Sequence, residues 1–455
     1  MNSLMIGTET AALKIPPEAI ALIAALQLRE PDTSLLQVLS DQEWTSLLTF
    51  SDLAHLTLPL AQLPGTGFPS WVVERLAINS ADNALRFERV KASYKEAADA
   101  LDHAGIEHIV IKGFAQAPEY VKDARLRAQS DIDLYCPAEK IKSAQIALQS
   151  IGYVPNKEVD YSRADHAPTM VRTGNWKWQG NPFDPEMPLS IELHFCLWNE
   201  ATCLFPIRGV DAFWDRRIKR VVEELSFPSL SPLDQLGYFA LHILRNVLPN
   251  QWVIHHVREL AVFLHSHATD DAFWKDWSET HDPSLRQLEA IAFYYAHAWF
   301  DCRLHQQVEN AIANIASVQQ RWLHRFAGSA LEVMFHQNKD SVWLHLSLLE
   351  SFSKKLILLK QTFVPTHISS IDSTAVKVDN RRLRGLSGAH PFKQYVAYLA
   401  SRSASYSSLS VTTLLRGIRW RFSPHQLVRQ FWIFLAASFF LTWACRSTSF
   451  SSIFF

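Results

Sequence analysis

Asp131 and Asp133 give the clearest chemical signal in the sequence, because they alternate with apolar residues in the stretch SDIDLYC (residues 130–136). Side chains of a β-strand alternate between its two faces, so both carboxylates point the same way, about 7 Å apart, while Ile132 and Leu134 point into the core. Two carboxylates this close repel one another and raise each other's pKa. A divalent cation with oxygen ligands offsets that repulsion. The stretch therefore predicts a metal site, for Mg²⁺ or Mn²⁺, on one face of a strand.

A second stretch, SIELHF, repeats the pattern with Glu192 and His194 on one face. If this strand lies beside the first, Glu192 becomes the third metal ligand, although 59 residues separate it from Asp133. Three carboxylates can hold two Mg²⁺ ions about 3.5–4 Å apart, an arrangement that activates an attacking hydroxyl and stabilises a leaving phosphate. His194 is a further candidate for the same site. The alternative for the aspartate pair is an edge strand with a solvated face and no metal.

Three residues upstream of the aspartates are candidates for binding a phosphate chain. Lys112 and Gly113 end the apolar run EHIVIKG, where a strand-to-helix turn would place backbone N–H groups and an ammonium against phosphate oxygens. Arg127, just upstream of the aspartates, would add a charge-assisted contact to the same triphosphate. The alternatives are an exposed lysine at an ordinary strand end, and an ion pair of Arg127 with Asp123 or with an aspartate of the motif.

The elements that must position these residues indicate an α+β fold, in which a small mixed-sheet domain is embedded between helical regions. A predicted amphipathic helix spans residues 83–105 and ends at Gly105. Its apolar positions recur at the spacing of helical turns, every three to four residues, and include Leu85, Val90, Tyr94, Ala97 and Leu101. Three strands separated by helical stretches then follow between residues 105 and 225. Ser231 and Pro232 open the next helical region as its N-cap and first helical residue.

At this point the sequence resembles a known family. The stretch GIEHIVIKGFAQAPEYVKDARLRAQSDIDLYC followed by SIELHFCLW is similar to the bacterial uncharacterised nucleotidyltransferase family, of the polymerase-β-like nucleotidyltransferase superfamily. The resemblance is strongest over residues 82–200 and looser through the N-terminal helices and residues 241–264. It implies that Asp131 and Asp133 bind metal and that Glu192 completes the set. The sequence departs from the superfamily pattern at Lys112-Gly113, where Gly-Ser or Gly-Gly is usual.

The expected function is metal-dependent transfer of a nucleoside monophosphate from an NTP to an unidentified acceptor hydroxyl, with release of pyrophosphate. Two alternatives are a non-catalytic nucleotide-binding protein that keeps the nucleotidyltransferase fold and an adaptor at the membrane surface. A glycosyltransferase also uses D-x-D, but it would need a larger nucleotide-sugar domain before the motif. The predicted layout is a helical region at 1–104, a catalytic α/β domain at 105–225, a helical acceptor-side domain at 231–365, a linker at 366–380 and a tail at 381–455.

The predicted tail is basic, with ten Lys or Arg residues and no Asp or Glu, which leaves 34 basic and 45 acidic side chains in residues 1–380. Such a tail binds an anionic partner, lipid headgroups or nucleic acid, or packs on the acidic body. Its apolar run at 431–445 is shorter than the roughly 20 residues of a spanning helix, which leaves a buried terminal helix or peripheral membrane contact. Five scattered cysteines without a C-x-x-C pair predict no disulfide partner and a cytoplasmic location, peripheral to the inner face of the membrane if the tail binds lipid.

Overall fold

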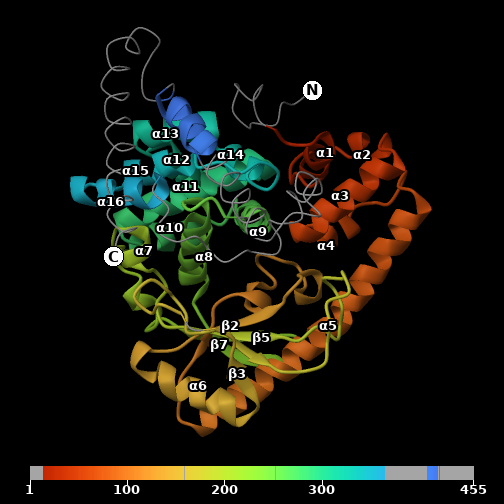
Figure 1. Cartoon of the computed structure of the whole chain (residues 1–455), viewed down its shortest axis with the longest axis vertical. Coiled ribbons are helices and arrows are strands. Elements are labelled where there is room, and N and C mark those ends of the chain that lie inside the picture. The colour runs from red at the N-terminus through yellow and green to blue at the C-terminus, as the bar shows by residue number, and fades with distance from the viewer. Residues whose placement is uncertain (1–13, 158, 252, 364–406, 419, 421–455) are drawn as a thin grey trace, which may run out of the picture.

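The computed structural model describes residues 14–157, 159–251, 253–363, 407–418 and 420. Its long helices surround one sheet (Figure 1). The helices are α1 (Pro17–Ala25), α2 (Ser34–Gln37), α3 (Asp41–Leu53), α4 (Thr57–Ala61), α5 (Ser70–His103), α6 (Ile141–Ser150), α7 (Glu200–Cys203), α8 (Pro232–Val247), α9 (Ile254–Ser266), α10 (Asp271–Thr280), α11 (Pro283–Phe300), α12 (Gln306–Ala313), α13 (Ser317–Phe326), α14 (Ser329–Glu332), α15 (Ser341–Leu348) and α16 (Phe352–Phe363). The strands are β1 (Ile109–Val110), β2 (Asp131–Tyr135), β3 (Tyr153–Pro155), β4 (Met170–Arg172), β5 (Ser190–His194), β6 (Ile218–Val222) and β7 (Leu225–Ser229).

The seven strands form one mixed sheet in the order β3-β4-β5-β2-β1-β7-β6. The pairs β2–β5 and β1–β7 are parallel, and the other neighbours are antiparallel. The α+β prediction, a mixed sheet between helical regions, is therefore confirmed. The sequence predicted three of these strands, whereas the edge pairs β3–β4 and β6–β7 were not predicted. The division of the chain into domains stays a prediction.

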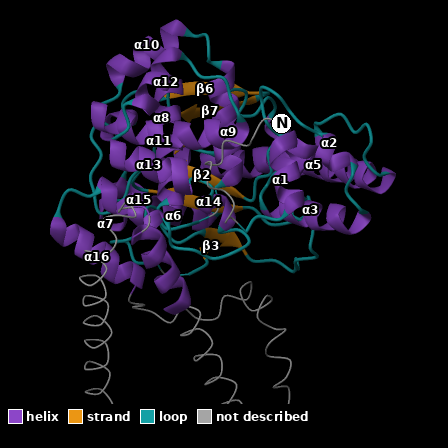
Figure 2. Cartoon of the chain, turned by 90° about the horizontal axis from the view of Figure 1, so that it is seen from above, coloured by secondary structure: helices purple, strands orange, loops and turns teal. Residues whose placement is uncertain are grey.

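One face of the sheet is apolar and is covered by α5 and α6. Ile132 and Leu134 of β2 are fully buried in a core that α5 and α6 share with the sheet. Because successive strand residues face opposite ways, Asp131 and Asp133 point to the other side. That side lies toward α8 and α9 (Figure 1), and the view from above shows the strands behind this layer of helices (Figure 2). The sheet thus has one apolar face and one face that carries the candidate site.

Helix α5 ends where the sequence predicts it, since Gly105 follows with a φ of +66°. Four of the five predicted apolar positions are buried, but Leu85 is 60% exposed, so that position was wrong. The polar residues Asn83 and Arg86 are buried in its place. Both donate to backbone carbonyls between residues 125 and 187, so a polar anchor rather than an apolar contact joins this part of α5 to the neighbouring loops.

Helix α8 begins as predicted, because the Ser231 side chain accepts from the Asp234 backbone N–H and Pro232 occupies the first turn. In the tail, residues 407–418 are helical. Arg416 there pairs with Glu332 at 3.3 Å and with Asp340 at 2.5 Å, so this part packs on the acidic body. The predicted linker and the apolar run at 431–445 lie outside the described residues. Within the described part of the chain, none of the helices has the length and apolarity needed to cross a membrane.

A buried charge cluster joins α8, α10 and α11. His281 Nδ1 lies 2.8 Å from Glu289 Oε1, and His281 Nε2 lies 3.8 Å from Asp234 Oδ1. Burial opposes protonation of His281, but the two carboxylates outweigh it and raise the pKa of His281 to about 9. His281 is therefore protonated at neutral pH, and together with Arg216, which pairs with Asp234, it balances the charge of the two acids.

This cluster predicts a stability that falls as the pH rises. A group whose pKa is raised by folding stabilises the fold fully below its unfolded value and loses that effect as the pH passes its folded value. We expect His281→Gln to lower the free energy of unfolding at pH 6.5 by on the order of 3 kcal/mol and the deficit to shrink toward pH 9.5. Urea unfolding across this range measures it, with His103→Gln at the exposed end of α5 as the control. A deficit that stays constant with pH would contradict the assignment.

Candidate active site

The first two strands of the site are neighbours in the middle of the sheet. β2 pairs with β5 in parallel, and the register places Asp133 opposite Glu192. Partners in adjacent strands share a face, so the two carboxylates lie side by side as the sequence predicted. The solvated edge-strand alternative is wrong, because β2 lies between β5 and β1 and Asp133 is only 3% exposed.

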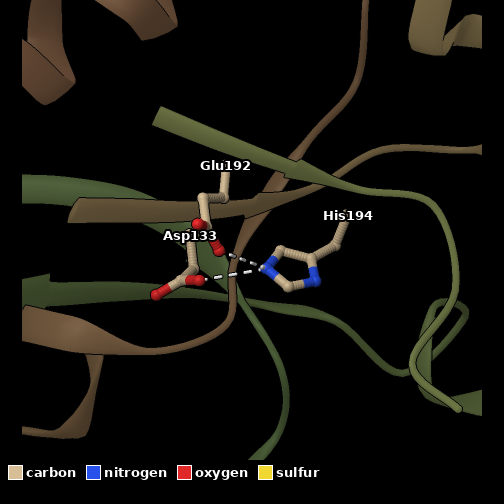
Figure 3. Close-up of side chains that lie close together, drawn as sticks. All are labelled: Asp133, Glu192 and His194. Atoms are coloured by element: carbon tan, nitrogen blue, oxygen red, sulfur yellow. Dashed lines mark hydrogen bonds and ion pairs between the residues drawn. The ribbon is translucent and has the colours of Figure 1, made fainter. Parts of the chain in front are cut away.

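His194 completes a tight group with these two carboxylates. Ligand atoms of Asp133, Glu192 and His194 all lie within 4.8 Å of one another, and the imidazole points between the two acids (Figure 3). His194 Nε2 is 3.0 Å from Asp133 Oδ1 and 3.7 Å from Glu192 Oε2. Two carboxylate oxygens and an imidazole nitrogen form a donor set that fits a divalent cation. Glu192 also accepts from the Thr169 hydroxyl at 3.2 Å, which fixes its carboxylate.

Lys112 is the cation beside this group. Its Nζ lies 2.6 Å from Asp133 Oδ1, and the residue is only 9% exposed, so the exposed-lysine alternative is wrong. Burial raises the pKa of Asp133, but Lys112 and His194 more than reverse this effect and hold that pKa well below its usual value. The phosphate contact proposed for Lys112 stays a prediction.

Asp131 lies beside the group and behaves differently from Asp133. Burial, followed by the charge of Asp133, raises the pKa of Asp131 to about 6, while Lys112 opposes the rise. The neighbouring acids of one motif thus differ strongly in pKa, which is the electrostatic situation common at active sites. At neutral pH both are ionised, and the carboxylates of Asp131, Asp133 and Glu192 exceed the charge of Lys112 by two. This surplus suits a divalent cation.

Gly113 follows Lys112 at the start of a short 3₁₀ turn, Gly113–Gln116. Its φ is +70°, and a Cβ added there would lie 2.4 Å from Gln129 Nε2. That amide in turn donates to the Asp131 backbone oxygen at 2.6 Å. The glycine therefore permits a close approach that holds the entry to β2 in place.

Arg127 is held by the helical region rather than by the loop around it. Its Nε donates to Glu259 Oε1 of α9 at 2.9 Å, while Asp123 pairs with Arg125. The alternative that Arg127 pairs with Asp123 is therefore wrong, and Glu259 is its partner. A contact of Arg127 with a triphosphate stays a prediction.

Five polar residues that were not predicted as site members lead from His194 toward Arg127. Asp165 faces His194 and pairs with Arg245 of α8, whose Nη2 donates to His242 Nδ1 at 3.1 Å. His242 Nε2 lies 3.1 Å from His256 Nε2, and His256 Nδ1 lies 3.5 Å from Glu259 Oε2. A continuous chain of polar contacts thus runs from the sheet through α8 and α9 to Arg127.

The two histidines of this chain are neutral. Burial, and after it the positive charge of nearby cations, lowers the pKa of His242 and of His256 well below the usual value. Polar residues recurring on the otherwise apolar helices α8 and α9 were the signal that could have drawn attention to them. The sequence alone does not show which of these polar residues meet.

Two neighbouring strands thus present acids to one buried face, and a lysine just after the strand on the other side of β2 pairs with Asp133. The sequence model of the uncharacterised nucleotidyltransferase family matches residues 40–301, more than half of the chain. The chain belongs to this family. None of the curated proteins and none of the solved structures matches it.

The close approach at Gly113 predicts a specific effect of adding a methyl group. Gly105→Ala, at a similar φ of +66° with nothing within 4 Å, should cost roughly 1–2 kcal/mol of unfolding free energy from backbone strain alone. Gly113→Ala should cost about 1–3 kcal/mol more, because the Gln129 amide must give up its partly buried hydrogen bond to the Asp131 carbonyl oxygen. Urea unfolding measures both. Adding Gln129→Ala to Gly113→Ala should reduce the excess, and equal losses for the two glycines would contradict the close approach.

Proposed function

We propose that the chain transfers a nucleoside monophosphate from an NTP to an acceptor hydroxyl and releases pyrophosphate. The observation that carries the proposal is the alignment of Asp133 and Glu192 on paired parallel strands, with Asp131 two residues away on the same face. Membership of the nucleotidyltransferase family supports the reaction class. The NTP, the metal and the acceptor are the proposed parts.

Each site residue has a role in this proposal. Asp131, Asp133 and Glu192 would hold a divalent cation, Mg²⁺ or Mn²⁺, which when bound polarises phosphoryl oxygens and stabilises charge on the leaving group. Lys112 and the backbone at Gly113 would contact the triphosphate. Arg127 would add a third contact through the part of its guanidinium that Glu259 does not hold.

In the reaction the acceptor oxygen forms a bond to the α-phosphorus, and the bond from that phosphorus to the bridging oxygen of the β-phosphate breaks. Pyrophosphate leaves with the electron pair of the broken bond. We assign removal of the acceptor proton to Glu192, whose carboxylate is less buried than that of Asp133. The helices that follow the sheet would shape the acceptor pocket.

The second candidate is a protein without catalysis, either a nucleotide-binding protein that keeps the fold or an adaptor that contacts a membrane surface through its basic tail. It needs no cluster of acids that burial makes costly, so the buried charge of Asp133 favours the enzyme. We propose a cytoplasmic location for the protein under either candidate function.

The proposal predicts label transfer from α-³²P-labelled ATP, GTP, CTP or UTP with Mg²⁺ or Mn²⁺ in a lysate and with purified protein. We expect a discrete labelled product with the wild type and a loss of about two orders of magnitude or more in Asp133→Asn, because several kcal/mol of charge stabilisation depend on this group. Asp160→Asn, at an exposed position on the loop between β3 and β4, is the matched control and should keep full transfer. Absence of transfer together with absence of metal-dependent NTP binding by calorimetry would favour the adaptor.

A further inference from the structure

His194 is an almost fully buried imidazole with an acid facing each of its ring nitrogens. It is 1% exposed. On one side Nε2 faces the pair Asp133 and Glu192 at 3.0 and 3.7 Å, and on the other Nδ1 lies 3.3 Å from Asp165 Oδ2. Nε2 makes a hydrogen bond with Asp133, whereas Nδ1 is a buried nitrogen that faces the Asp165 carboxylate at an ion-pair distance without hydrogen-bond geometry. Burying a polar ring is costly, so the acids on its two sides indicate a defined role for it.

The Nδ1 side has the arrangement that supports metal-binding histidines. Such a histidine almost always donates its other ring N–H to a carboxylate or a carbonyl, which fixes the ring and raises its basicity as a ligand. Asp165 is in the position of that carboxylate, and Arg245 of α8 pairs with Asp165 and holds it in place. Helix α8 therefore holds the acid that faces the Nδ1 side of the ring.

We propose that His194 Nε2 is a direct ligand of the site's cation together with Asp133 and Glu192, so that the site prefers an ion that accepts nitrogen, such as Zn²⁺, over Mg²⁺. This inference rests on the metal dependence in the proposed function and revises the expected ion. Imidazole suits Zn²⁺ and related transition metals, whereas Mg²⁺ takes oxygen ligands. Two acids and one imidazole leave a coordination position open, as catalytic zinc sites do.

Coordination uses the lone pair of Nε2. In the structure this nitrogen makes a hydrogen bond with the Asp133 carboxylate, which can only accept, so Nε2 carries a proton. When the ion binds, Nε2 gives up this proton and Nδ1, which faces Asp165 Oδ2 at 3.3 Å, carries the ring proton instead. The loss of the Asp133 hydrogen bond is offset because the same carboxylate becomes a ligand.

His166 is the built-in control for this assignment. Its Nε2 lies 4.0 Å from Glu192 Oε2, and its Nδ1 is 2.7 Å from the Ala167 carbonyl oxygen, which can only accept. His166 thus also points a free nitrogen toward the acids, but it is more exposed and lies outside the tight group of three. An experiment must tell the two imidazoles apart.

The first test is pulsed electron paramagnetic resonance of Mn²⁺ bound to the purified full chain. A directly bound nitrogen gives ¹⁴N modulation that changes when the protein is made with ¹⁵N-histidine. We expect this signal in the wild type and in His166→Asn, and its loss in His194→Asn. No histidine nitrogen in the wild type, or loss of the signal in His166→Asn, would overturn the proposal. If circular dichroism shows that His194→Asn does not fold, the signals of the wild type and of His166→Asn still test the proposal.

The second test is calorimetric titration of the metal-free chain with Zn²⁺ and with Mg²⁺. Asp165→Asn should weaken Zn²⁺ binding about 10- to 100-fold, the range for partners behind a metal ligand, and change Mg²⁺ binding far less. Equal losses for the two ions would mean that the imidazole is not a ligand. Neither test uses nucleotidyl transfer. If nitrogen coordinates the ion but no nucleotidyl transfer is found, the metal-site proposal holds and the proposed function is wrong. If transfer is found without nitrogen coordination, the proposed function holds and the metal-site proposal is wrong.

Discussion

The ionised carboxylate of Asp133, buried in the middle of the sheet, is the constraint on which the rest of the site depends. An isolated buried charge is far too costly to persist, so the fold must bring partners to it. Lys112 follows the end of β1 by two residues, and β5 supplies His194. β1 and β5 are the two strands that flank β2. The strand order β5-β2-β1 is thus also the order that surrounds Asp133 with groups able to balance its charge.

The same requirement extends outward to the helices. Asp165 and Glu259 bring further negative charge to the site, and Arg245 and Arg127 pair with them. Glu259 and Arg245 belong to α9 and α8, so these pairs join the sheet to the helical region at defined points. Buried ion pairs contribute little net stability compared with apolar packing, but removing one partner leaves the other charge unpaired. Their effect is therefore to fix how the helices sit over the site.

The local part of this arrangement could be predicted from the sequence. Alternation in the D-x-D and E-x-H stretches placed the acids on strand faces. Gly105 marked the end of α5 and Ser231 the start of α8. These features could be predicted because each is determined by residues only a few positions away. Leu85 was misplaced because the polar anchor of α5 depends on loops far along the chain. The outer strands β3, β4, β6 and β7, of which β3 and β6 form the edges, were missed because short segments become strands only when a neighbour pairs with them.

The partners of the site residues could not be predicted for a related reason. Arg127 and Glu259 are separated by 132 residues, and nothing in the spacing of either indicates the other. The adjacency of Asp133 and Glu192 was predicted only on the condition that their strands pair. Sequence patterns therefore identified which side chains carry the chemistry, whereas their electrostatic setting is a property of the folded chain.

That setting bears on how many cations the site accommodates. Asp131, Asp133 and Glu192 together with Lys112 leave a surplus of two negative charges, since His242 and His256 are neutral. One divalent cation brings the cluster to neutrality. A second, as in the two-ion arrangement that three carboxylates suggest, would leave two positive charges, which the negative charge of a triphosphate can balance. The charges of the chain alone thus fit one resident cation, and a second fits only together with the nucleotide.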